Sequence, residues 1–271
     1  ILIPLFGWIV FSWIGIWSYA SAEIEPPVFD ALSYVHKAQT FWQSFLSLKP
    51  FNPFSLEPTV RPFGTVLLSY PFGFSEDFRP FYFRSSFVPL VIFGLSSFIF
   101  IQYKNLTLSQ KIMLVSLCIA SASAPSLFQF ALNERAISVM GSWGFVDLFF
   151  ASVGTLAASF ILRDGHGKFV RYSIIASALS VFTVFIKPAG LSLMMVLAIA
   201  WFINAVFRLK SSLITSIEFK KGILVFLIIY VLTILIIYNS NYFSPENCQY
   251  AVQSMKTVRS ADGYYPSFLY I

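Results

Sequence analysis

The sequence has little charge. Lysine, arginine, aspartate and glutamate together make up 11% of its 271 residues, whereas a soluble domain typically carries about 25%. So few charged groups cannot cover the surface of a water-soluble protein, which argues against soluble enzymes and soluble binding domains. The formal net charge is +6, but no run of basic residues interleaved with polar ones accompanies it. We therefore expect no nucleic-acid partner.

Cysteine and histidine are also scarce. Cys118 lies in an apolar run and Cys248 in a polar tail, so we expect the two thiols at different depths and predict no disulfide. His36 has neither a cysteine nor the second histidine near it in the sequence, which argues against a zinc site. The sequence thus does not indicate a metal site, and it leaves the cofactors open, a divalent metal included.

Long apolar runs are what the chain has in abundance. Hydrophobic residues make up 57% of it, 32 of them phenylalanine, and the mean hydropathy is +0.75. A transmembrane helix needs about 20 mostly apolar residues. We predict an all-α polytopic membrane protein, with residues 1–271 forming one transmembrane domain of a longer chain. The seven expected spans are 1–20, 85–103, 112–131, 142–162, 172–187, 190–207 and 222–238.

Lysine and arginine set the expected orientation. The loops that carry them on one side are 104–111, 163–171 and 208–221. Cytoplasmic loops are enriched in these residues, so residues 21–84 become the first non-cytoplasmic loop. The apolar run 66–74 is about half the length of a span, and counting it as one would spoil the charge pattern. Asn105-Leu106-Thr107 matches a glycosylation acceptor but falls on the cytoplasmic side, so we interpret it as chance.

The first loop contains a predicted amphipathic helix at residues 30–46. Pro26-Pro27 blocks a helix before it, and Asp30 is a plausible N-cap. One apolar stripe recurs at steps of three and four, through Leu32, Val35, Ala38, Trp42 and Phe45. The segment is too polar to span a membrane, so we expect it to lie in the interface as a juxtamembrane helix.

Ionisable residues close to a membrane are costly and are functional candidates by default. Each candidate also has a structural alternative. Asp30 is a helix cap or a catalytic carboxylate, and Asp147 is catalytic or pairs with Arg135 or Lys187. Lys187 contacts a substrate, or its stem lies along apolar surface while its amine reaches water. Glu134 and Arg135 bind a substrate or form a solvated turn.

All five of these residues fall on the non-cytoplasmic face in the predicted topology. A carboxylate base and cations around a leaving phosphate are the minimum for glycosyl transfer from a lipid phosphate. A proton-coupled transporter could use the same residues, but it would more typically place its acids near the membrane midplane.

Four stretches, in the same order, are similar to those of a known family. PPVFDALSYVHKA places Asp30, Tyr34 and Ala38 in register with an acid-Tyr-Ala loop motif. The stretch from Arg61 to Leu95 then resembles a His-Pro-Pro-Leu segment followed by an arginine, here Arg84. The other two are APSLFQFALNERAISVMGSWGFVDLFF, with Asp147 as second acid, and FIKPAGLSLMM, with Lys187. The chain thus resembles the C-type-fold membrane glycosyltransferases, such as protein O-mannosyltransferases and aminoarabinose transferases of lipid A.

The resemblance implies an inverting transferase that uses a dolichyl- or undecaprenyl-phosphate-linked sugar, with a lipid, glycan or protein acceptor. Asp30 would be the general base and Asp147 a second catalytic acid. The residues expected to bind substrate are Tyr34, Arg61, Arg84, Glu134, Arg135 and Lys187. Ala31 and Arg61 depart from the family, which often has a second acid and a histidine there. We expect a bacterial inner membrane with the site on the periplasmic side. The alternative is a non-catalytic lipid-sugar flippase, transporter or scaffold subunit.

Overall fold

The computed structural model describes residues 2–22, 30–49, 64, 66, 79–102, 106–113, 115–116, 136–163, 167–187 and 189–238. All regular secondary structure in these ranges is helical. The long helices are α1 (Leu2–Ala22), α2 (Asp30–Leu46), α3 (Arg79–Ile101), α5 (Ala136–Leu162), α6 (Phe169–Ile186), α7 (Gly190–Lys210) and α8 (Ser216–Tyr238).

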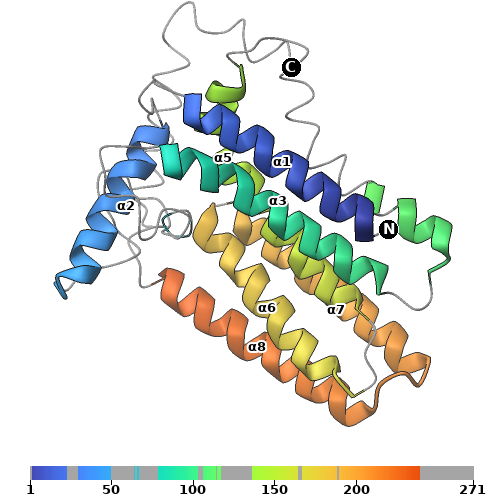
Figure 1. The fold of residues 1–271 in the computed structure, drawn as a ribbon. Coiled ribbons are helices and arrows are strands. Elements are labelled where there is room, and N and C mark those ends of the chain that lie inside the picture. Colours follow the sequence, from blue (N-terminus) through green and yellow to red (C-terminus); the bar gives the residue numbers. More distant parts are fainter. Residues whose placement is uncertain are drawn as a thin grey trace, which may run out of the picture.

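Six of these helices form a bundle, and α2 lies apart at one end of it (Figure 1). The helix pairs in closest contact are α3 with α5, α5 with α6, and α6 with both α7 and α8. We call the end beside α2 the α2 end; α1, α6 and α8 finish there, and α3, α5 and α7 begin there. We call the opposite end the basic end, because it carries Arg163, Lys168, Arg171, Arg208, Lys210, Lys220 and Lys221.

Small polar side chains lie within the apolar core of the bundle, and much of its exterior is apolar. The fully buried side chains of α6 include Ser177, Ser180 and Thr183, whose hydroxyls donate to carbonyls of their own helix. Many of the large side chains exposed on α7 and α8 are apolar, among them Phe202 and Leu232. Small polar residues let membrane helices approach closely, whereas in water this exterior would be unfavourable. The packing is therefore compatible with helices surrounded by lipid.

An aromatic stack joins α6, α7 and α8. The ring of Trp201 lies 5.9 Å from that of Phe169 and 4.2 Å from that of Phe226, measured between centroids. Trp201 is buried, and its indole N–H donates to Ser173 Oγ at 2.9 Å. The one polar atom of this side chain is thereby satisfied, as burial requires. Aromatic burial is thus what holds the three helices together.

Within the described ranges, three helices are long and apolar enough to cross a membrane: α6, α7 and α8. They match the spans predicted at 172–187, 190–207 and 222–238, and they are compatible with an integral membrane protein. Helices α1, α3 and α5 overlap three more predicted spans, with shorter apolar stretches in their described parts. Most of the span predicted at 112–131 lies outside the described residues. The count of seven spans stays a prediction.

Helix α2 confirms the helix predicted at residues 30–46, but the predicted stripe is wrong in part. Phe41 is buried at 8% exposure, whereas Phe45 is 52% exposed. The buried face of α2 therefore turns through Ala38, Phe41 and Trp42. Phe41 and Phe45 both fit a spacing of three and four residues, so the sequence alone does not show which ring is buried. The packing partner of α2 determines it.

Thr107 has a structural role in the loop where the sequence matches a glycosylation acceptor. Its backbone N–H donates to Gln110 Oε1 at 2.9 Å, and the Gln110 N–H donates back to Thr107 Oγ1 at 3.3 Å. These reciprocal bonds form a capping box. They start the short helix that begins at residue 108. Helix capping therefore explains this threonine.

At the basic end, side chains of α7 cap the end of α5. The last carbonyls of a helix lack partners within the helix. Arg208 Nη2 donates to the Leu162 carbonyl at 2.8 Å, and Asn204 Nδ2 donates to the Ile161 carbonyl at 2.6 Å. Arg208 is only 6% exposed. This charge is therefore part of the bundle's structure, unlike the exposed lysine that follows at position 210.

Replacing Arg208 by methionine should destabilise the bundle. Arg208→Met keeps much of the side-chain length but removes a charged donor, and bonds of this kind contribute about 1.5–3 kcal/mol. Lys210→Met, on the same helix turn but exposed, should cost less than about 1 kcal/mol. Unfolding by sodium dodecyl sulfate, followed by tryptophan fluorescence, measures both. Equal losses in the two variants would contradict the capping role.

Candidate functional site

The structure describes the eight predicted site residues to different extents. Side chains are described for Arg84 and Lys187. Only the helical backbone is described for Asp30 and Tyr34, on α2, and for Asp147, on α5. Arg61, Glu134 and Arg135 lie outside the described residues. The described part of the site therefore consists of the side chains of two cations and the backbone positions of three further residues.

Lys187 lies in a tight turn between α6 and α7. Its backbone N–H donates to the Thr183 carbonyl at 3.1 Å, and its carbonyl accepts from the Gly190 N–H at 2.8 Å. A Cβ on Gly190 would overlap the Thr183 carbonyl group, so only glycine lets α7 begin this close to α6. The half-buried Lys187 is thereby fixed at the end of α6 and the start of α7.

Asp147 lies at nearly the same depth as Lys187. Helices α5 and α6 are antiparallel neighbours, and the rings of Phe149 and Phe182 are 6.0 Å apart between centroids. Asp147 lies two residues from Phe149 on α5, and Lys187 lies five residues from Phe182 on α6, both toward the α2 end. At 1.5 Å per residue, the two positions differ in depth by about one helical turn.

Arg84 also lies near this depth. Helices α3 and α5 run in the same direction (Figure 1), and at their far ends Arg163 Nη2 donates to Gln102 Oε1 at 2.6 Å. Arg84 comes 18 residues before Gln102 on α3, and Asp147 comes 16 residues before Arg163 on α5. At 1.5 Å per residue, the two lie about 27 and 24 Å from this bond, toward the α2 end. Arg84 stands one residue before the span predicted at 85–103, and burial lowers the pKa of its guanidinium.

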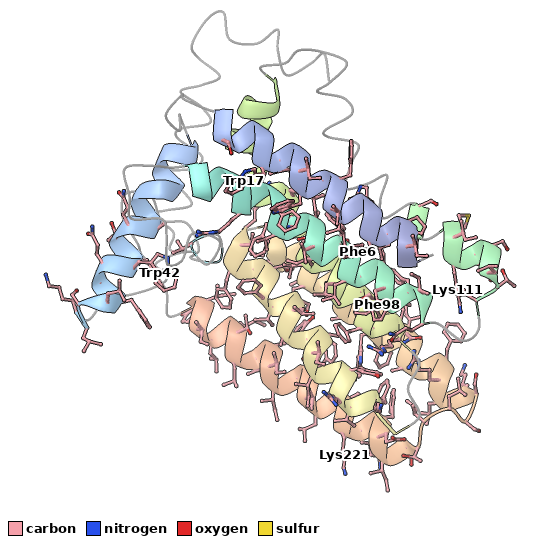
Figure 2. The ribbon with its side chains drawn as sticks, in the orientation of Figure 1. Phe6, Trp17, Trp42, Phe98, Lys111 and Lys221 are labelled. Atoms are coloured by element: carbon pink, nitrogen blue, oxygen red, sulfur yellow. The ribbon has the colours of Figure 1, made fainter. Side chains whose placement is uncertain are left out.

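Gly64 and Val66 connect α2 to this region. The indole N–H of Trp42, which Figure 2 labels, donates to the Val66 carbonyl at 3.3 Å, and both residues are buried. A Cβ on Gly64 would lie 2.6 Å from the Phe185 carbonyl oxygen and 2.9 Å from Ile186 Cγ1. The chain at position 64 therefore runs directly over the end of α6, next to Lys187. Helix α2 also contacts α5.

Sequence reasoning missed Gly64 and Gly190, and it took Trp42 only as part of an apolar stripe. The signal for Gly190 was weak: a glycine two residues after a proline, at the start of an apolar run. Nothing in the sequence indicated Gly64 or its contact with α6, because the two segments are about 120 positions apart. These residues position the site through close backbone approach.

The arrangement favours an anion. Arg84 and Lys187 lie at nearly the same depth, and α7 begins at the same turn, where the helix dipole favours negative charge. Lys187 also has a structural alternative, because a cation at the end of α6 is stabilised by the helix dipole. Within the described ranges, no three His, Cys, Asp or Glu residues gather as a metal site.

Gly190→Ala tests how firmly the turn holds Lys187. The added methyl group meets backbone atoms of α6 that cannot move aside, so the loss of stability should be about 1–3 kcal/mol. Gly15→Ala is the matched control on α1, since nothing lies within 4 Å of its Cβ position. It should be neutral or slightly stabilising. Detergent unfolding measures both, and a Gly190→Ala protein as stable as the control would refute the tight turn.

Comparison with protein-family profiles, with curated proteins and with solved structures finds no match to this chain. The resemblance to the C-type-fold glycosyltransferases therefore stays a prediction. The candidate site rests on the geometry of the α2 end.

Proposed function

We propose that this chain is a membrane glycosyltransferase that moves a sugar from a polyprenyl phosphate to an acceptor at the α2 end of the bundle. The observation that carries the proposal is the common depth of Arg84, Asp147 and Lys187, at the end of the bundle where α2 lies. Two cations and two acids at the membrane boundary suit a phosphate that departs and a hydroxyl that must lose a proton.

The cations would bind the donor phosphate. The turn around Gly190 fixes the backbone from which the Lys187 amine would reach the leaving phosphate, where a cation stabilises the developing negative charge. Arg84 lies near the same depth, and its guanidinium can bind a phosphate through two parallel bonds. Arg61 and Arg135, which lie outside the described residues, are proposed as further cations for the phosphate.

In the proposed reaction, an acceptor hydroxyl or amine gives its proton to the Asp30 carboxylate. The acceptor oxygen or nitrogen forms a bond to the anomeric carbon as the bond from that carbon to the phosphate oxygen breaks. The polyprenyl phosphate leaves with the electron pair, and the anomeric configuration inverts. Asp147 would orient the acceptor or one of the cations, and Tyr34, one turn from Asp30 on α2, would contact the substrate with Glu134.

The proposal includes an orientation. With seven spans and the basic end on the cytoplasmic side, the α2 end faces away from the cytoplasm. In a bacterial inner membrane this is the periplasmic side. A polyprenyl chain would then lie along the apolar exterior of the helices, with its phosphate near Lys187.

Asp30→Asn tests the proposed base. The change keeps the size of the side chain but removes the group that accepts the proton, so the transfer rate should fall by about 10²–10⁴-fold. Asp164→Asn makes the same change in a loop predicted on the opposite face and should leave the rate unchanged. The assay follows sugar transfer from an undecaprenyl-phosphate donor, or a dolichyl one, by the purified protein.

A decrease of less than about ten-fold for Asp30→Asn would eliminate Asp30 as the base. If the unaltered protein binds the polyprenyl phosphate but no acceptor yields a product, the non-catalytic flippase or scaffold hypothesis replaces the transferase.

A further inference from the structure

The turn between α7 and α8 is tightly specified by its own backbone. We call residues 207–221 the basic hairpin. Leu213 N–H donates to the Arg208 carbonyl at 2.9 Å, and Ser212 N–H donates to the Leu209 carbonyl at 3.1 Å. Ser212 has φ 54°. These bonds and the left-handed residue form the Schellman motif that ends a helix. The end of α7 is therefore well defined.

A capping box then starts α8. The backbone N–H of Thr215 donates to Glu218 Oε2 at 2.9 Å, and the Glu218 N–H donates to Thr215 Oγ1 at 3.2 Å. Glu218 is the one acid in the basic hairpin, and its carboxylate is held in this cap. The hairpin is thus a rigid element whose acid has a structural role.

Exposed cations surround this turn. Lys210, Lys220 and Lys221 are exposed on the basic hairpin, and Lys168 and Arg171 are exposed on the neighbouring start of α6. No ion pair between these five and any other residue is found in the described part of the chain. The positive charge at this end therefore faces outward.

Close packing brings the two groups of cations together. Gly222, directly after Lys221, is buried against the ring of Phe169, directly after Lys168. A Cβ on Gly222 would lie 2.7 Å from Phe169 Cε1 and 2.9 Å from Trp201 Cζ2. The starts of α6 and α8 are thus side by side, and Figure 2 labels Lys221 at this end. The cations form one surface.

Large apolar side chains are also exposed on the basic hairpin. Phe207 is 65% exposed and Ile217 is 63% exposed. A soluble anion would make no contact with these apolar side chains. An acidic phospholipid can place its phosphate near the lysines and its acyl chains against Phe207 and Ile217. Phe207 lies in the last turn of α7 and Ile217 in the first turn of α8, and both helices are long enough to span a membrane. In a membrane, the hairpin would therefore lie at the depth of the lipid headgroups.

We propose that the basic hairpin and the start of α6 bind acidic phospholipids of the surrounding leaflet. The inference is independent of the transferase proposal, because it concerns the opposite end of the bundle. Each lysine near an anionic membrane surface strengthens binding about five-fold. Three lysines should therefore strengthen binding on the order of 100-fold over a neutral surface.

The test measures the thermal midpoint of the full chain in a nonionic detergent, by tryptophan fluorescence, during titration with phosphatidylglycerol or phosphatidylcholine. Phosphatidylglycerol should raise the midpoint at far lower concentration than phosphatidylcholine, and 0.5 M salt should weaken its effect through screening. The K210Q/K220Q/K221Q variant should need on the order of 100-fold more phosphatidylglycerol for the same shift.

Two control variants separate charge from folding. Lys49→Gln removes an exposed lysine at the other end of the bundle and should leave the response unchanged, as should K210R/K220R/K221R, which keeps the charges. The proposal is overturned if the two lipids act alike on the unaltered protein. It is also overturned if the glutamine variant keeps the full response, or if the arginine variant loses it. An equal shift with inorganic phosphate would indicate an anion site without lipid selectivity and would likewise refute it.

Discussion

The structure depends on the close packing of α6 against its neighbours. Its inward face carries serine and threonine hydroxyls that bond to their own helix, so three other helices can approach without leaving polar groups unsatisfied. Tyr230 of α8 adds a link across the interface, through Ser180 at 2.8 Å and the Met194 carbonyl at 3.0 Å. Because α6 is central, its two ends define the two chemical environments of the bundle.

Those environments differ in the way charge is held. At the basic end, Arg208 is buried as a helix cap, while the lysines around it are exposed. At the α2 end, Lys187 is half-buried in a turn that Gly190 makes possible. A cation on a backbone held in one turn suits a specific ligand, whereas a group of exposed lysines suits a surface of headgroups. The proposed transferase site and the proposed lipid contact follow from this difference.

Much of the helical architecture could be predicted, because apolar length and loop charge are local properties of the sequence. The helix at residues 30–46 is such a case. The contact of Gly64 with the end of α6 could not be predicted, since it joins residues far apart in the chain. The same limit explains the error at Phe41 and Phe45, where the packing partner selects the buried ring. Of the candidate site, the sequence indicated Lys187 and Arg84, but their common depth required the packing of α3, α5 and α6.

The proposed donor site at the α2 end can be tested by photo-crosslinking with a polyprenyl phosphate that carries a diazirine beside its phosphate. After ultraviolet irradiation of the membrane-embedded protein, crosslinked peptides can be mapped by mass spectrometry. The account predicts labelling of α2 and of the turn around Lys187, with competition by unlabelled polyprenyl phosphate. Labelling confined to residues 207–221, or labelling that no competitor reduces, would contradict a donor site at the α2 end.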